Sequence, residues 1–404
     1  EENDLTNGPT NSYSTLRLFG QQIEEPQVIL YRDNHAWCPY CQKVWLWLEW
    51  KMIPYKIRKV TMRCYGEKES WYLKKVRSGL LPAIEIDNNI ITESDQILFV
   101  LQSIYGPLGS DLNKEETLEL RKLERELFRA WCIWLCNPSF RPSQESRRKE
   151  QYKVVAEELE QRLKKSDTPW LDPIIINSTD SSPGSGDVIF IPYLERMNAS
   201  LSYYKGFCLR EEYTYIDNWF RNLEKSNVYI GTQGDFHTHA HDLPPQMGGC
   251  WFDHNLKQSN FSNLIDNGKG LAKLESSRES TKDNHQKALA LRRVLKHRKC
   301  ILEINPLGAK MFDQPLRAAL TNMMFKEDCA PETGTAMGLR YLRDRISVPR
   351  DMSLLAAREL RQALEKTAQL DSSEQGPPIP IGNRFDQDPK PFLRIKASTP
   401  NQSN

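Results

Sequence analysis

The sequence passes from a strand to a helix at the stretch Ala36-Trp37-Cys38-Pro39-Tyr40-Cys41, which follows the apolar run Val28-Ile29-Leu30-Tyr31. This order places the first sulfur at a strand-to-helix corner, where free backbone N–H groups and the helix dipole stabilise a thiolate. Pro39 suits the first helical turn because it has no N–H to leave unpaired. Cys38 and Cys41 are three residues apart and are expected on one helix face, with Cys41 deeper. The stretch predicts a reactive thiol.

The alternative for Cys38 and Cys41 is a structural cysteine pair or half of a zinc site. A structural zinc site needs a second pair of ligands at suitable spacing, and the sequence has no other Cys-x-x-Cys. The nine cysteines are odd in number and irregularly spaced. They indicate a reducing compartment rather than a disulfide framework.

A chain of 404 residues exceeds one ordinary domain, so two or three domains are expected. The hydrophobic content of 39% is enough for real cores, and the net charge of +2 implies neither nucleic acid nor another acidic partner. No apolar run has the length that spans a bilayer. The polar start, residues 1–14, does not resemble a signal peptide, although it is compatible with a mature end left after a targeting segment is removed.

Residues 28–107 are expected to form an α/β domain, preceded by a flexible N-terminal arm over residues 1–27. Hydrophobic periodicity predicts strands at 28–31 and 55–60 with a helix between them. A hairpin over 84–91 and a helix over 94–105 follow. This β-α-β, β-β-α order is the thioredoxin-like arrangement.

Three features, in order, resemble the glutathione-binding half of cytosolic-type glutathione transferases of the cysteine type. They are the Cys-Pro-Tyr-Cys after a strand, Leu81-Pro82 before the third strand, and Glu93-Ser94 at the start of the last helix. In that family the proline is cis, and the preceding residue pairs through its backbone with the cysteinyl part of glutathione. The resemblance assigns these roles to Pro82 and Leu81.

The same resemblance implies that Glu93 and Ser94 bind the γ-glutamyl group. Ser94 at a helix N-terminus is suited to a carboxylate, and Glu93 to an ammonium group. Lys74 falls where cysteine-type members carry a lysine for the glycine carboxylate, with Lys75 as the neighbouring alternative.

The resemblance makes glutathione the expected co-substrate and Cys38 the nucleophile. A cysteine forms a mixed disulfide with glutathione, which suits thiol transfer, deglutathionylation and dehydroascorbate reduction. Cys41 is either a resolving thiol or a buried helix residue.

Residues 113–250 are expected to form an all-helical transferase domain. Asp187 matches the buried aspartate at the start of the family's core helix, but Gly184 stands where a capping serine or threonine belongs. Three aromatic residues are candidates for a second-substrate pocket, and core packing is the alternative for each: Phe128, Trp131 and Tyr193.

The histidines His237, His239 and His241 are expected in an extended segment, where alternate side chains point to one side. They are weak candidates for a zinc or other divalent metal site, and a packed loop is the alternative. Residues 242–251 are expected to be rigid and non-helical.

Residues 258–404 are expected to form a mainly helical extension, with a linker or mobile loop over 257–282 and an extended or disordered tail from 371. Helical patterns are found at about 284–299, 314–325, 336–345 and 353–367, and Asp351 or Ser353 is suited to cap the last of them. Residues 282–366 carry 17 Lys and Arg against 10 Asp and Glu. The cluster Arg340, Arg343, Arg345 and Arg350 is a candidate surface for a protein complex, anionic lipid or phosphate, and internal charge pairing is the alternative.

The Cys-Pro-Tyr-Cys site, the segment 242–250 and the runs 341–345 and 348–352 together resemble the iota class, known from cyanobacteria, algae and non-vascular plants. The transferase resemblance covers about residues 28–230 and the class resemblance reaches about 390. It implies a photosynthetic source and a chloroplast location, with the cytoplasm as alternative, and transferases are usually homodimers.

The preferred hypothesis is a glutathione-dependent thiol transferase or reductase. A rival is a transferase fold kept as a scaffold and docked through its extension to a larger, photosynthetic complex. A third reading is a metal-binding regulator built on the three histidines.

Overall fold

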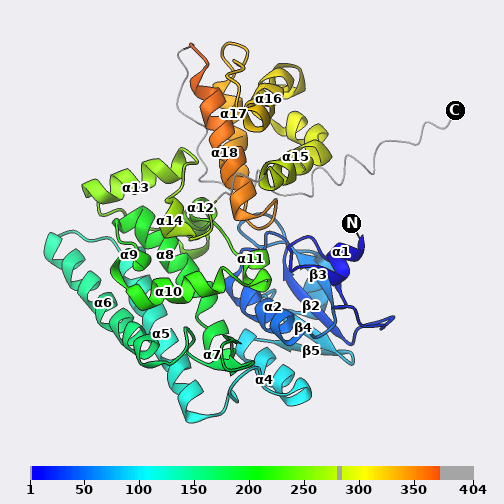
Figure 1. Cartoon of the computed structure of the whole chain (residues 1–404), viewed down its shortest axis with the longest axis vertical. Helices are drawn as coiled ribbons and strands as arrows, with labels where there is room; N and C mark the ends of the chain where they lie inside the picture. The colour runs from blue at the N-terminus through cyan, green and yellow to red at the C-terminus, as the bar shows by residue number, and fades with distance from the viewer. Residues whose placement is uncertain (1, 280–283, 374–404) are drawn as a thin grey trace.

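The computed structural model describes residues 2–279 and 284–373. Figure 1 shows three parts: a blue sheet domain, a cyan and green helical domain beside it, and a yellow to orange helical unit above both. The predicted fold class is therefore confirmed: a thioredoxin-like α/β domain, a helical transferase-type domain and a helical extension.

The N-terminal domain is built on a five-stranded mixed sheet in the order β1-β3-β2-β4-β5. Strand β2 runs parallel to β3 and antiparallel to β4, as the thioredoxin-like order requires. The elements are α1 (Glu2–Asn7), β1 (Leu16–Arg17), β2 (Val28–Asp33), α2 (Pro39–Lys51), β3 (Tyr55–Val60), α3 (Ser70–Lys75), β4 (Ala83–Ile86), β5 (Asn89–Thr92) and α4 (Ser94–Tyr105).

The segment before β2 is not a free arm, and that prediction is wrong for residues 2–27. Strand β1 pairs with β3, and the buried guanidinium of Arg17 contacts Glu49 of α2 at 2.8 Å. Arg17 also donates to the carbonyl oxygens of Leu5 and Gly8. One buried cation thus organises the segment, because an unpaired charge in this position is costly.

The helical domain surrounds α8, whose residues are all buried. Helices α5 and α6 form its long antiparallel pair (Figure 1). The elements are α5 (Glu115–Cys136), α6 (Pro142–Lys165), β6 (Pro173–Ile175), β7 (Ser181–Pro183), α7 (Ser185–Val188), α8 (Ile191–Lys205), α9 (Leu209–Glu212), α10 (Thr214–Leu223), α11 (Asn227–Thr232), α12 (Phe236–Met247), α13 (Leu256–Asp266) and α14 (Ala272–Glu275).

Asp187 is buried at the start of the core helices, as predicted. Its carboxylate accepts from the backbone N–H groups of Leu171 (2.8 Å) and Asp172 (3.0 Å) and from Trp219 Nε1 (2.8 Å). Gly184 replaces a capping serine or threonine for lack of space, because a Cβ there would lie 2.4 Å from the Asp172 carbonyl oxygen. Ser185 does not supply the missing cap, since its hydroxyl accepts from Trp47 Nε1.

The predicted linker over 257–282 is wrong for its described part. Helices α13 and α14 belong to the helical domain, where Phe261, Ile265 and Leu271 join the main core. Gln258 Nε2 also donates to the Tyr203 carbonyl oxygen at 2.8 Å. The segment looked polar because these few apolar residues are separated by polar ones on the outer face.

The extension has a core of its own, formed by α15 (His285–Ile304), α16 (Gly308–Phe325), α17 (Ala336–Arg345) and α18 (Leu354–Gln369). The helix predicted over 336–345 is confirmed exactly. Ser353 caps α18, as predicted, by accepting from Ala356 N–H. The predicted tail from 371 lies outside the described residues beyond 373.

Buried contacts tie the extension to the rest of the chain. Arg361 of α18 pairs with Asp235, and Arg358 pairs with Glu275 at 2.6 Å. Val348 N–H donates to Thr238 Oγ1 at 3.0 Å. The extension is thus packed on the helical domain as one body with it.

The arginine cluster of the extension is used internally. Arg340 and Arg343 pair with Glu365, and Arg350 pairs with Asp351. The guanidinium of Arg345 lies 3.7 Å from the ring centroid of Tyr341. These contacts favour the alternative of internal pairing over a basic docking surface.

Among the helices that the structure describes, none has both the length and the apolar character needed to cross a bilayer.

Candidate active site

Cys38 stands immediately before the first residue of α2, at the end of the loop from β2. The carboxylate of Asp33 accepts from the backbone N–H groups of Trp37 (2.6 Å) and Cys38 (3.2 Å) and so fixes the corner. Cys38 is 6% exposed and Cys41 is 1% exposed. The relative depth of the two sulfurs is therefore the one predicted.

The two thiols act on each other. Burial raises the pKa of the Cys41 thiol, and its hydrogen bond to Cys38 raises it further. Cys41 is thus held as a neutral thiol that donates toward Cys38. A ligand atom of Asp33 lies within 4.8 Å of both sulfurs, so these three groups also have the spacing of a partial metal site.

Arg196 of α8 is a site residue that the sequence patterns did not reveal. Its guanidinium donates to the Trp37 carbonyl oxygen and lies 4.9 Å from the Trp37 ring centroid. Burial lowers the pKa of Arg196, whereas the neighbouring charges, Glu195 first and Cys38 after it, raise it. The buried cation of Arg196 therefore lies within electrostatic reach of Cys38.

The Leu81–Pro82 peptide bond is cis, as the resemblance implied. The carbonyl oxygen of Leu81 lies 4.0 Å from Cys38 Sγ. The backbone of Leu81 therefore faces the thiol.

Glu93 and Ser94 open α4, which begins at the predicted residue. Glu93 has φ +65° and ψ 112°, a conformation that residues other than glycine rarely adopt. Such backbone outliers concentrate at functional sites. Ser94 is buried, and the next residue, Asp95, binds Lys43 of α2 at 2.5 Å, which links the two helix starts.

Lys68, rather than Lys74, is the lysine that lies near the thiols. Lys74 is exposed on α3. Lys68 precedes that helix, and its ammonium donates to the Thr61 carbonyl oxygen at 3.1 Å. Burial lowers the pKa of Lys68, and the charges of Cys41 and Cys38 raise it. Lys75 binds Glu85 at 2.9 Å and is therefore already paired.

Two of the three predicted pocket aromatics lie beside the thiol helix. The Tyr193 ring contacts those of Phe128 and Tyr40, with centroids 5.4 and 5.8 Å apart. Tyr40 follows Pro39 in α2 and is 36% exposed. The Arg125 guanidinium covers Phe128 at 4.7 Å. Tyr193 is itself 1% exposed and is a core residue, so the candidate second-substrate surface is formed by Tyr40 and Phe128.

Trp131 is a core residue, the alternative stated for it. It is 1% exposed, and its Nε1 donates to Ser200 Oγ at 3.0 Å. A fully buried indole with its polar atom satisfied offers no surface to a substrate.

The histidine segment is helical, so the prediction of an extended, non-helical run is wrong. Helix α12 covers it, and Asp235 caps the helix by accepting from Thr238 N–H at 2.9 Å. His237 and His241 share one face, whereas His239 lies on the opposite side near Glu195, at 3.9 Å. The three histidines therefore do not form one site.

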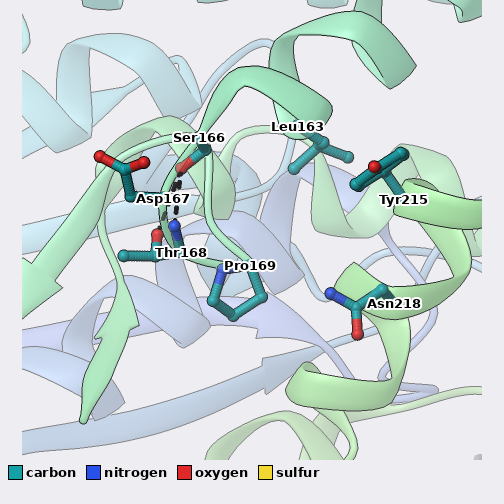
Figure 2. A pocket seen from close by; sticks show the side chains of 7 residues that line it. All are labelled: Leu163, Ser166, Asp167, Thr168, Pro169, Tyr215 and Asn218. Carbon is teal, nitrogen blue, oxygen red and sulfur yellow. Dashed lines mark hydrogen bonds between the residues drawn. The ribbon is translucent and has the colours of Figure 1, made fainter. Parts of the chain in front are cut away.

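A pocket elsewhere on the helical domain contains none of the predicted site residues. Figure 2 shows it between the end of α6 and α10. Its lining is Leu163, Ser166, Asp167, Thr168, Pro169, Tyr215 and Asn218. It offers no thiol and no cationic side chain, so it is not the site of the chemistry described above.

The fold and the site define a thiol-bearing thioredoxin-like domain joined to a helical domain. Residues 37–104 match the family described as the glutathione S-transferase N-terminal domain. Glutathione S-transferase DHAR2 of Arabidopsis thaliana is 24% identical over 199 residues, which cover 48% of this chain and 84% of that protein. Over these residues, the chain is similar to glutathione S-transferases.

Two further similarities each cover half of this chain or slightly more. Glutathione S-transferase L3 of Arabidopsis thaliana is 25% identical over 238 residues, covering 57% of this chain and 88% of that protein. The crystal structure of Chlamydomonas reinhardtii dehydroascorbate reductase is 18% identical, covers 50% of this chain and 90% of that chain, and has a TM-score of 0.40.

Proposed function

We propose that this protein is a glutathione-dependent thiol transferase or reductase with Cys38 as its nucleophile. The observation that carries the proposal is the surroundings of Cys38: a helix start fixed by Asp33, a neutral thiol donor at Cys41 and the buried cation of Arg196. A helix start, a hydrogen-bond donor and a nearby cation are the surroundings typical of reactive cysteines.

In deglutathionylation, the Cys38 thiolate attacks the glutathione sulfur of a mixed disulfide. A Cys38–glutathione disulfide forms, and the substrate sulfur leaves as a thiolate that takes up a proton. A second glutathione thiolate then attacks the glutathione sulfur of that disulfide. Oxidised glutathione leaves, and the Cys38 thiolate is restored. In dehydroascorbate reduction, two molecules of glutathione supply the two electrons and are released as oxidised glutathione.

The glutathione tripeptide has a path along the edge formed by α2, the Leu81–Pro82 turn and α4. Leu81 offers its backbone to the cysteinyl part, and Glu93 and Ser94 offer a carboxylate and a helix start to the γ-glutamyl part. Lys68 offers a cation for the glycine carboxylate. Tyr40 and Phe128, which pack around the buried Tyr193, are the proposed surface for the second substrate.

The two Arabidopsis relatives named above support the glutathione-dependent chemistry, since both are named glutathione S-transferases. The finer assignments are also proposals: the iota class, a plastid or cytoplasmic location and a homodimer. The rival role as a docked scaffold was suggested by a basic surface on the extension. That surface no longer supports it, because the arginines concerned are paired within the chain.

The experiment that tests the proposal measures glutathione-dependent reduction of a small mixed disulfide and of dehydroascorbate by the wild-type protein. Mass spectrometry after exposure to oxidised glutathione should show one added glutathione on Cys38. Glutathione binding is measured separately by calorimetry. A protein that binds no glutathione and reduces neither substrate contradicts the proposal and favours the scaffold role.

Lys68→Met is expected to weaken glutathione binding, and Lys74→Met provides the matched comparison. A charge-assisted hydrogen bond contributes about 1.5–3 kcal/mol, so we expect the KM for glutathione to rise by roughly 10-fold to 100-fold in Lys68→Met. Lys74→Met, on the exposed side of α3, should change the KM by less than about 2-fold. Steady-state kinetics with varied glutathione decide between the two lysines, and the reverse pattern would restore the assignment of Lys74.

A further inference from the structure

A second cluster of side chains with ligand chemistry lies where α12, α13 and α17 meet, apart from the thiols. His237 and His241 are four residues apart on α12, so their rings lie one above the other, with centroids 4.6 Å apart. Asp266 ends α13, and its Oδ1 lies 2.8 Å from His241 Nε2. One ligand atom from each of these three residues lies within 4.8 Å of the others.

The burial of the His237 imidazole is not explained by hydrogen bonding within the protein. Its ring is 3% exposed, and neither ring nitrogen has a hydrogen-bond partner among the described residues. The nearest carboxylate oxygen, Asp344 Oδ1 of α17, is 3.7 Å from Nε2, which is too long for a hydrogen bond. A buried polar group without a partner costs about 1–3 kcal/mol. The ring is therefore placed for a partner that lies between the side chains.

The chemistry of the cluster suits a divalent transition metal. Two imidazoles on one helix face and a carboxylate from a second helix are a donor set that Zn²⁺ favours. Asp344 approaches His237 Nε2 to 3.7 Å, but it accepts from Arg343 at 2.7 Å and is not a member of the group with ligand spacing. A cation would gain the Asp266 carboxylate and satisfy the His237 ring at once.

We propose that His237, His241 and Asp266 bind a divalent transition-metal ion of the Zn²⁺ type. Ligand atoms about 2.0–2.1 Å from a tetrahedral ion lie roughly 3.3 Å from one another. His241 Nε2 and Asp266 Oδ1, which are 2.8 Å apart, therefore separate by a few tenths of an ångström when the ion binds.

The ion would connect two helices of the helical domain. His237 and His241 belong to α12, whereas Asp266 ends α13. A ligand that binds only the folded state raises its stability in proportion to the logarithm of the ligand concentration. The bound ion would therefore hold α12 against α13, a role separate from the thiol chemistry.

The parent protein for the test is the full chain carrying Cys38→Ser and Cys41→Ser, treated with a chelator to remove bound metal. The two substitutions remove the thiols of the Asp33–Cys38–Cys41 group, which also has ligand spacing. Equilibrium dialysis against Zn²⁺ with elemental analysis should show one ion per chain. His241→Gln and Asp266→Asn, which alter partly exposed ligands, should each weaken binding by more than about 100-fold, since losing a residue that only orients a ligand already costs about 10–100-fold. The exposed His254→Gln is the matched control and should bind as the parent does.

Two further readouts keep the proposal open to refutation if a variant folds poorly. Co²⁺ should give a visible d–d spectrum without the near-ultraviolet sulfur bands that thiolate ligands produce. Zn²⁺ should raise the Tm of the parent chain and of His254→Gln but not that of His241→Gln. Absence of uptake by the parent, equal uptake by His241→Gln and Asp266→Asn, or sulfur bands with Co²⁺ would each overturn the site. None of these readouts depends on glutathione activity.

Discussion

Replacing Cys38 with serine is expected to reduce glutathione-dependent disulfide reduction by about 1,000-fold or more. The thiolate is both the attacking group and the partner in the mixed disulfide, and a serine hydroxyl at this corner can be neither. The change is small in volume, so the helix start and its contacts with Asp33 are retained. Initial rates with a small mixed disulfide, at saturating glutathione, measure the effect.

Cys41→Ser is the comparison that separates two mechanisms. The mechanism proposed here needs one protein thiol, because a second glutathione resolves the intermediate. Cys41→Ser should then keep a rate within about 10-fold of the wild type, the loss coming from a changed donor beside Cys38. A loss as large as that of Cys38→Ser would show that Cys41 resolves the intermediate. Equal activity of Cys38→Ser and wild type would refute the nucleophile assignment.

The local features of this chain follow from its sequence because they depend on neighbours a few residues away. Helix α4 begins at Ser94 and α17 ends at Arg345, as predicted, since apolar periodicity and helix caps act within one or two turns. The thiol corner and the cis Leu81–Pro82 bond were likewise expected, the second from the family resemblance.

Helix α12 was not predicted from the sequence because it is stabilised by a residue that is distant along the chain. Two prolines in sequence suggest a break, since Pro244 has no N–H for the carbonyl oxygen of Ala240. In the structure the Tyr204 hydroxyl donates to that oxygen at 2.9 Å. A tertiary hydrogen bond thus replaces the missing helical one. Rules based on neighbouring residues cannot predict this contact.

The candidate site could be predicted only where its residues share one short stretch. Arg196 reaches Trp37 from a helix about 160 positions later, and nothing in its own surroundings marks it. Lys68 stands in a loop without periodicity, whereas Lys74 stands in a helix that pattern analysis detects. The approach of Lys68 to the thiols becomes visible only when the loop after β3 is placed against α2.

Asp187→Ala is expected to destabilise the folded protein by about 4 kcal/mol or more, the largest stability effect that we predict. The carboxylate is fully buried and accepts from four donors: Leu171, Asp172 and Gly184 through their backbone N–H groups, and Trp219 through its indole. Each donor left buried and unpaired costs about 1–3 kcal/mol. Partial relaxation keeps the total below the sum of the four.

The prediction is checked by urea unfolding, with Asp180→Ala as a matched control because Asp180 is an exposed aspartate in the hairpin just before this cap. The control should stay within about 0.5 kcal/mol of the wild type. Asp187→Asn keeps one acceptor oxygen but turns an amide N–H₂ toward the donors, so we expect an intermediate loss. The four donors come from the 171–172 loop, the start of α7 and α10, and Asp187 is the group on which they converge. A loss below 1 kcal/mol in Asp187→Ala would therefore mean that these segments hold their arrangement by apolar packing alone.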